Sequence, residues 1–201
     1  MSIAVALICI GCTSLGVGNR HQAMGLVIAY GLAEGASPKD GVRAETLSGR
    51  SLFGGSLGKG LSTNTYFGDK GGLPEIVRVT WRSGEGILLD LGSGRWKGGQ
   101  IAGDHTIPVR SRIPKEVLDY ALAGPNRVLR LIFRVKDDGV LLAWDVQEAI
   151  SLPQFNTGGT WVYAMHGGDL PCEVPRQGGP NCTEGPLEKA PWFNPSWIRG
   201  R

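Results

Sequence analysis

The clearest pattern of hydrophobic and polar positions along the chain is an alternation on both sides of a short polar turn. Apolar residues recur at every second position within Arg127–Val135 and again within Val140–Gln147. A period of two is typical of β-strands that bury one face. The intervening Lys136-Asp137-Asp138-Gly139 suits a tight turn. The pattern predicts an antiparallel hairpin with a buried face formed by Leu129, Leu131, Phe133, Val135, Val140, Leu142, Trp144 and Val146.

Polar side chains mark the other face of this predicted hairpin. Arg130 and Arg134 lie on its first strand, and Asp145 and Gln147 lie on its second. Antiparallel sheets commonly bury one face and expose the other to water. These four side chains are therefore expected to face solvent.

Shorter patterns predict further strands and one helix. Strands are expected at Leu26–Leu32, Ile76–Arg82, His105–Ser111 and Thr160–Met165, with a short apolar run at Ile87–Leu91. The helix is expected from Pro114 to Ala123, because proline suits the first helical turn and a Gly-Pro pair follows as a stop. Its apolar stripe comprises Val117, Leu118, Ala121 and Leu122.

Glycine shapes the prediction for the first half of the chain. The sequence contains 32 glycines, about twice the usual share. The segment from Ala33 to Gly72 is expected to be mostly loop, with short strands around Val42–Leu47 and Ser62–Phe67. The expected fold is therefore mainly β, an antiparallel sheet or sandwich with one short helix at about 114–123 and long Gly-rich loops. The Gly-rich loop at 48–72 has no assigned role.

Composition narrows the class of protein. The chain has 201 residues, which fits one domain with a tail. Hydrophobic residues make up 41% and charged residues 19%, as in globular proteins. The net charge of +3 is small, and no run of lysine and arginine could form a nucleic-acid footprint. Nucleic acid is therefore not an expected partner.

The pattern of apolar residues at the N-terminus predicts an export signal. The apolar run Ile3–Ile10 is followed by Gly11 and Cys12. The run is shorter than the roughly 20 residues that span a bilayer and fits a signal-peptide core. Its end resembles the lipobox of bacterial lipoproteins, although Cys9 stands where leucine is usual and no basic residue precedes the run. The resemblance implies a signal peptide at 1–11 and a lipid anchor on Cys12, and a buried N-terminal strand is the alternative.

The other two cysteines lie near the end of the chain. A β-rich domain is expected at 12–170, and a Pro- and Gly-rich tail at 171–201 contains Cys172 and Cys182. In an oxidising periplasm this pair is expected to form a disulfide. Free thiols are one alternative and a metal site is another, although His166 fits no zinc spacing.

Bulky aromatic residues close the tail. They are Trp192, Phe193 and Trp197. Large aromatic side chains are unfavourable in water, so they are expected to dock on the domain. A partner-binding tail is the alternative, because exposed aromatics are common interface anchors.

Motifs for chemistry are weak throughout the chain. Ser56 stands in a G-x-S-x-G match, but glycine and a Ser-Thr-Asn-Thr run follow where a nucleophile elbow needs a helix. Gly58-Lys59 lacks the flanking residues of a phosphate-binding loop. Asp104-His105 and the pair His166 and Asp169 read as surface or turn residues. No catalytic residue, metal or small-molecule cofactor is expected, and the chain is not expected to be an enzyme.

Four arginines form a set of charged residues that could bind a partner. Arg78 and Arg82 lie on one face of the Ile76–Arg82 strand, and Arg130 and Arg134 lie on the polar face of the hairpin. If these strands are neighbours, the four make a basic patch. One interpretation is a solvated face with weak ion pairs. The other is a docking surface for an acidic protein.

One region resembles a known family. Gly72-Leu73-Pro74-Glu75 leads into a strand that ends in Trp81-Arg82, and the Ile113-Pro114 helix start and the hairpin with Gly139 and Trp144 follow. This succession, from 72 to 147, resembles a family of Gram-negative bacterial lipoproteins of unknown function. Members are often encoded near type VI secretion effectors, including lipases.

The resemblance implies a role and an address. It implies a non-catalytic immunity protein, held in the periplasm by its lipid, that blocks a toxin by direct contact. Because Thr13 rather than aspartate follows Cys12, the outer membrane is the expected attachment site. A structural or assembly lipoprotein of the envelope is the alternative. A third hypothesis, an envelope hydrolase, would depend on Ser56.

Overall fold

The structure is a computed structural model that describes residues 25–67, 72–124, 127–150, 160–172, 182–191 and 193. The predicted signal peptide at 1–11 and the predicted lipid acceptor Cys12 lie outside the described residues.

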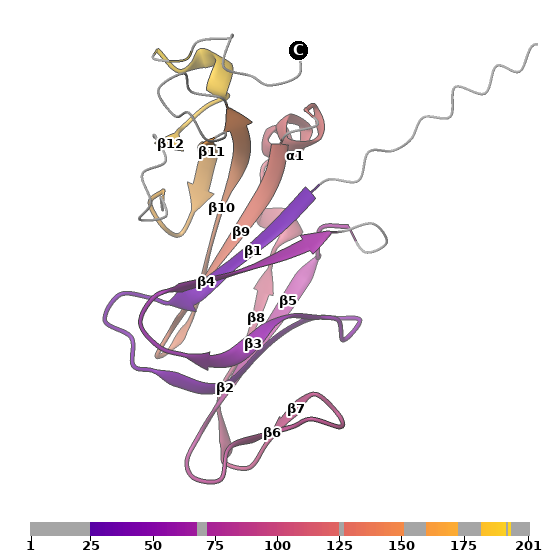
Figure 1. Cartoon of the computed structure of the whole chain (residues 1–201), viewed down its shortest axis with the longest axis vertical. Helices are drawn as coiled ribbons and strands as arrows, with labels where there is room; N and C mark the ends of the chain where they lie inside the picture. Colours follow the sequence, from indigo (N-terminus) through magenta and orange to yellow (C-terminus); the bar gives the residue numbers. More distant parts are fainter. Residues whose placement is uncertain are drawn as a thin grey trace, which may run out of the picture.

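Two β-sheets pack face to face and make up most of the described chain (Figure 1). Sheet A has six strands in the order β12 (Cys182–Thr183), β11 (Thr160–Gly168), β10 (Gly139–Ile150), β9 (Arg127–Lys136), β1 (Gly25–Leu32) and β4 (Leu61–Phe67). Sheet B has four strands in the order β3 (Ser51–Leu57), β2 (Lys39–Thr46), β5 (Ile76–Ser83) and β8 (Gln100–Pro108). The predicted mainly β fold is confirmed.

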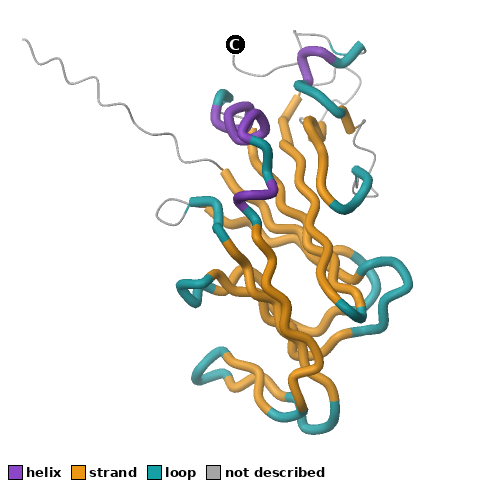
Figure 2. Tube along the Cα trace, turned by 180° about the vertical axis from the view of Figure 1, so that it is seen from behind, coloured by secondary structure: helices purple, strands orange, loops and turns teal. Residues whose placement is uncertain are grey.

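Small elements occupy the two ends of the sandwich. The helix α1 (Lys115–Leu122) lies at the same end as the C-terminal segment, which includes the 3-10 turn η2 (Leu187–Lys189). A second 3-10 turn, η1 (Arg110–Arg112), precedes α1. A two-stranded ribbon of β6 (Leu88–Asp90) and β7 (Arg95–Lys97) projects from the opposite end, as Figures 1 and 2 both show.

The predicted hairpin is confirmed as β9 and β10. Val140 pairs with Val135, and Gly139 pairs with Lys136, so the turn itself is Asp137-Asp138. The side chains of its predicted inner face are buried except that of Val140, which is partly buried, and Leu129, Leu131, Phe133 and Val135 are all 0% exposed. Alternation therefore predicted this face correctly, because the inner face of β9 packs against sheet B across the core.

The core lies between the two sheets and is joined by aromatic contacts. The ring of Phe53 on β3 stacks on that of Tyr30 on β1, with centroids 4.5 Å apart. It also contacts the ring of Phe133 on β9, at 5.5 Å. Offset and tilted aromatic pairs add to the hydrophobic stabilisation that burial provides. Phe53 thus ties an edge strand of sheet B to the centre of sheet A.

Two tryptophans lie over glycines of the neighbouring strand. Trp81 on β5 pairs with Gly103 on β8, and Trp144 on β10 pairs with Gly167 on β11. A Cβ atom added at Gly103 would overlap the Trp81 indole. Glycine in a strand often marks a close approach of this kind. The large ring is therefore accommodated because the opposite residue has no side chain.

Several sequence expectations are corrected by the structure. The segment 33–72 is not mostly loop, since β2, β3 and β4 all lie within it, although two short strands were expected there. Sheet A is not purely antiparallel, because β1 pairs in parallel with β9. The helix is confirmed, but Leu122 at its end is 49% exposed and does not join the buried stripe.

Candidate functional site

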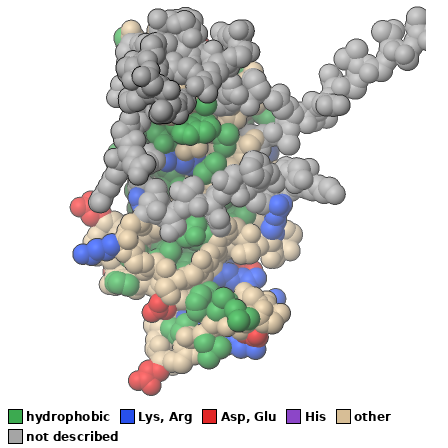
Figure 3. Space-filling model, in the orientation of Figure 1, with side chains coloured by type: hydrophobic (Ala, Val, Ile, Leu, Met, Phe, Trp, Pro, Cys, Tyr) green, Lys and Arg blue, Asp and Glu red, His purple; other side chains and the backbone are tan. Residues whose placement is uncertain are grey.

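The β6–β7 ribbon and the glycines at its base form an arm, residues 84–99, that carries exposed leucines. Leu88, Leu89 and Leu91 are 56%, 41% and 87% exposed, and Ile101 follows the arm at 57%. In Figure 3 hydrophobic side chains gather on this arm at the lower end of the molecule. Single exposed apolar residues are normal on a protein surface, whereas a cluster marks an interaction site. The arm is therefore the strongest candidate for a functional surface.

The base of the arm is held by close backbone packing. Gly98 has a φ of +73°, and a Cβ atom there would overlap the carbonyl of Gly86. The Gly99 N–H donates to the Glu85 carbonyl at 3.2 Å. Arg82 on β5 donates through Nη1 to the Gly98 carbonyl at 2.6 Å. These contacts fix the arm to the end of β5.

The tip of the arm is held by Asp90. Its carboxylate accepts hydrogen bonds from the Gly92 N–H at 3.0 Å and the Ser93 hydroxyl at 2.8 Å, and it forms an ion pair with Lys97. The Lys97 ammonium first, and then these two donors, lower the pKa of Asp90. The turn is thus closed by its own polar groups, and the leucines are presented on a folded ribbon.

A groove of about 230 Å³ lies between the arm and sheet B. It is lined by Val42, Arg43, Ser51, Phe53, Gly54, Gly55, Leu89, Gly94 and Trp96. Leu89 and Trp96 are cross-strand partners in the ribbon and form one wall. Gly54 and Gly55 of β3 contribute no side chains to the opposite side. Sequence reasoning missed both arm and groove, and the repeated glycines around Ile87–Leu91 were the available signal.

The four predicted arginines do not form one face. Arg78 and Arg82 lie on β5 of sheet B, whereas Arg130 and Arg134 lie on β9 of sheet A. Arg78 is exposed and its Nε donates to Asp104 Oδ1 at 2.7 Å. That hydrogen bond is the main cause that lowers the pKa of Asp104. A partner-binding role for the exposed arginine stays a prediction.

The prediction that the polar face of the hairpin is exposed to solvent is wrong for Arg130 and Asp145. Arg130 is 2% exposed and Asp145 is 0% exposed. The two residues are direct cross-strand partners, and Arg130 Nε donates to Asp145 Oδ1 at 3.0 Å. The guanidinium also lies 4.2 Å from the centroid of the Tyr163 ring on β11. A buried pair of this kind is held in the sheet and is not available to a partner.

The fourth predicted arginine, Arg134, is half-buried, and its Nη1 donates to the Leu32 carbonyl at 3.3 Å.

A second buried polar network joins α1 to the C-terminal segment. Arg127 Nε donates to Glu148 Oε2 at 2.9 Å, and its guanidinium forms an ion pair with Glu188 of η2. The Tyr120 hydroxyl donates to Glu148 Oε2 at 2.8 Å and accepts the Leu187 N–H at 3.0 Å. Burial raises the pKa of Tyr120 far above its usual value. These groups satisfy one another, so the network holds η2 against the sandwich.

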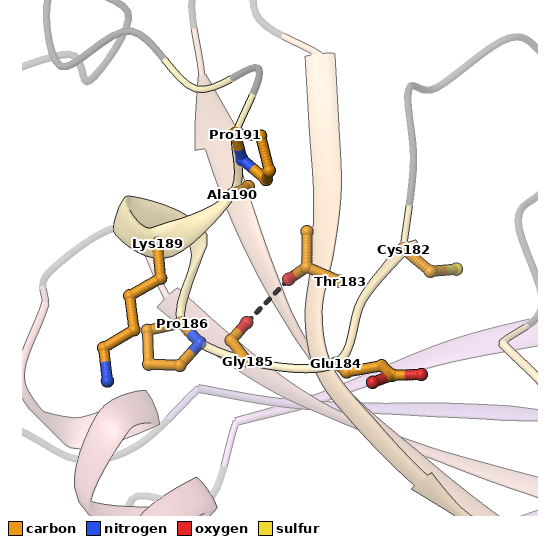
Figure 4. A pocket seen from close by; sticks show the side chains of 8 residues that line it. All are labelled: Cys182, Thr183, Glu184, Gly185, Pro186, Lys189, Ala190 and Pro191. Carbon is orange, nitrogen blue, oxygen red and sulfur yellow. Dashed lines mark hydrogen bonds between the residues drawn. The ribbon is translucent and has the colours of Figure 1, made fainter.

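The disulfide predicted between Cys172 and Cys182 is confirmed, with Cα atoms 6.0 Å apart. Beside Cys182 lies a hollow of about 280 Å³ (Figure 4), lined by Cys182, Thr183, Glu184, Gly185, Pro186, Lys189, Ala190 and Pro191. The Thr183 hydroxyl donates to the Gly185 carbonyl at 2.6 Å within it. The hollow is formed by consecutive residues of one segment, so it has few converging functional groups.

One of the three tail aromatics lies within the described residues. Phe193 packs against the buried cluster that contains Ile150, Val162 and Leu187. Trp192 and Trp197 lie outside the described residues.

Two of the residues considered for catalysis, His105 and Asp169, are held in other contacts, and Ser56 does not lie in a nucleophile elbow. Ser56 is exposed within strand β3, and not at a turn between a strand and a helix. The imidazole of His105 stacks on the Trp81 indole at 5.0 Å. Asp169 accepts the Leu142 N–H at 2.9 Å and forms an ion pair with Arg112. In the described part of the chain, no three potential metal ligands cluster, and no helix has the length and hydropathy to cross a membrane.

Comparisons with family models, with curated proteins and with solved structures return no match to this chain. The lipoprotein resemblance of residues 72–147 therefore stays a prediction.

Proposed function

We propose that this protein is a non-catalytic binding protein that docks a protein partner through the arm. We further propose that the partner is a secreted toxin, of the type VI effector class, which it neutralises by direct contact. The observation that carries the first proposal is the set of leucines at 88, 89 and 91, which the fold holds away from the core.

The energetics of the arm suit protein binding. Complete burial of one leucine side chain contributes roughly 1.5–3 kcal/mol. Leu91 is 87% exposed, so nearly all of its contribution is still available to an interface. Because the ribbon is closed by Asp90 and fixed at its base, little ordering is required when it binds. A preorganised apolar projection is well suited to insertion into a cleft of a partner.

The proposed address is the periplasm, through a lipid on Cys12. The disulfide between Cys172 and Cys182 favours an oxidising compartment, because such bonds seldom persist in the cytosol. An inhibitor of a toxin that enters the periplasm would have to reside there.

The experiment pairs the full chain with each secreted effector encoded beside its gene. Producing the chain should protect sensitive cells from one effector, and the purified proteins should bind. Leu91→Asp should abolish protection and weaken binding about 10- to 100-fold, since loss of one leucine's burial corresponds to one or two factors of ten. Leu47→Asp is the matched control, because Leu47 is 71% exposed but lies outside the arm.

Two results would contradict the proposal. One is that no neighbouring effector binds the chain. The other is that Leu91→Asp binds and protects as well as the unaltered protein. If deletion of the gene weakened the envelope in the absence of any effector, a structural role would replace the immunity role.

A further inference from the structure

We infer that the groove beneath the arm binds an aromatic side chain that has a neighbouring carboxylate, presented by the protein partner. This inference rests on the proposed binding function and names the chemistry that the groove recognises. It concerns Leu89, Trp96 and the strand that faces them, and not the exposed leucine at position 91.

The side of the groove formed by β3 includes two residues without side chains, beside Ser51 and Phe53. Gly54 and Gly55 are consecutive in this strand and pair with Arg43 and Val42 of β2. Two glycines weaken a strand, because they add no side-chain packing and lose more entropy on folding. Gly54 is also required by space, since an added Cβ would lie 2.9 Å from the Val42 carbonyl oxygen. Nothing lies within 4 Å of an added Cβ at Gly55, so the backbone there leaves room for a flat group to lie against it.

The opposite side of the groove is apolar. Leu89 is 41% exposed, and Trp96, its partner in the ribbon, is half-buried. An indole ring prefers an offset or edge-to-face aromatic neighbour. The volume of about 230 Å³ is smaller than most pockets for small-molecule ligands, which measure roughly 300–1,000 Å³. The groove therefore fits one side chain better than a metabolite.

Arg43 supplies the charge of the site. Among the described residues, it is the only charged one that lines the groove. Its Nε and Nη2 both contact one oxygen of Glu45, Oε2, at 2.8 and 2.7 Å. A guanidinium has five N–H donors, and the Arg43 side chain makes no other hydrogen bond or ion pair among the described residues. The remaining donors can bind a carboxylate beside the aromatic ring, and charge-assisted bonds of this kind are strong and directional.

The test uses two blocked dipeptides as probes, acetyl-Phe-Glu-amide and acetyl-Phe-Lys-amide. Binding to the full chain is followed by shifts of the backbone amides of Gly54 and Gly55 and of the Trp96 indole N–H in nuclear magnetic resonance spectra. The glutamate probe should bind with a Kd of about 0.1–10 mM, as expected for a ligand of this size. The lysine probe should bind at least about fivefold more weakly, because Arg43 repels its ammonium.

Paired variants locate the site. Leu89→Ser should weaken binding of both probes, whereas Leu91→Ser should leave it unchanged, because only the first residue lines the groove. Arg43→Gln should remove the preference for the glutamate probe, whereas Arg95→Gln should preserve it. A dispersed amide spectrum for each variant shows that it remains folded.

The inference is overturned if neither probe shifts these resonances, or if both bind equally to the unaltered chain. It is also overturned if effector binding survives Leu89→Ser and Arg43→Gln but is lost in Leu91→Asp, a result that leaves the proposed function standing. If the glutamate probe binds as expected but no effector does, the groove is supported and the immunity role fails.

Discussion

Neutralising Asp145 should destabilise the protein far more than neutralising an exposed aspartate of the same sandwich. Asp145 and Arg130 face each other across β9 and β10, and their side chains are 1% and 2% exposed. The substitution Asp145→Asn keeps the shape of the side chain but leaves the buried guanidinium without its counter-charge.

The size of the effect follows from this burial. Breaking one partner out of a buried ion pair costs about 3–5 kcal/mol, because the remaining charge cannot regain water. Domains are stable by only about 5–15 kcal/mol, so this loss is a large fraction of the total. With a urea dependence of roughly 2–3 kcal/mol per molar, the unfolding midpoint should fall by about 1–2.5 M.

The assay is urea unfolding followed by tryptophan fluorescence, with Asp104→Asn as the control. Asp104 also pairs with an arginine, Arg78, but the two side chains are 41% and 48% exposed. Exposed pairs are screened by water and contribute little. The control should therefore shift the midpoint only slightly.

A double variant tests whether the cost arises from the buried Arg130 charge that remains in Asp145→Asn. Arg130→Met combined with Asp145→Leu should recover most of the stability lost in Asp145→Asn, since well-packed apolar residues often replace a buried pair at little cost. The reasoning is refuted if Asp145→Asn and Asp104→Asn lower the midpoint equally, because the Arg130 charge would then have access to solvent.

Two further predictions concern packing and pH. Gly103→Ala should cost about 1–3 kcal/mol by overpacking against Trp81, and thermal unfolding should show no comparable loss for Gly58→Ala, where nothing lies within 4 Å of an added Cβ. Burial alone would raise the pKa of Asp169, but a backbone N–H and Arg112 outweigh it, so the pKa is lowered. The ionised carboxylate of Asp169 therefore stabilises the fold above the unfolded pKa of about 3.9, and this contribution is lost as pH falls through the folded pKa. Unfolding midpoints measured between neutral and acid pH should fall less for Asp169→Asn than for the unaltered protein. An equal fall of the midpoint in both proteins would contradict this assignment.

Elements defined by local patterns were predictable. The β9–β10 hairpin combines strict alternation with a polar turn, and both signals come from adjacent residues. The helix α1 was likewise marked by Pro114 and by the glycine that follows it. Strand β3 was missed because Gly54 and Gly55 have low strand propensity. They are placed in the sheet by pairing with β2 and by the aromatic contacts of Phe53, neither of which is visible locally.

The candidate site was less predictable than the fold. Alternation placed Arg130 on the polar face correctly, but its burial depends on Asp145 and on Tyr163, which lies more than thirty positions away along the chain. The basic patch required β5 and β9 to be neighbours, and sheet order cannot be read from one strand at a time. The arm depends on glycine backbone conformations at its base, and a run such as Ile87–Leu91 reads equally well as a core strand.

The parallel pairing of β1 with β9 has a consequence for when the protein can fold. The Arg134 side chain contacts the Leu32 carbonyl, although the two residues are 102 positions apart. Sheet A therefore cannot be completed until the β9–β10 hairpin has been synthesised, although β1 is synthesised much earlier. Topologies with such distant pairings fold slowly, because a long loop must be closed before its contacts are gained. A nascent chain of this design can pair β1 with β4 early, but β1 gains its second neighbour only after β9 has emerged.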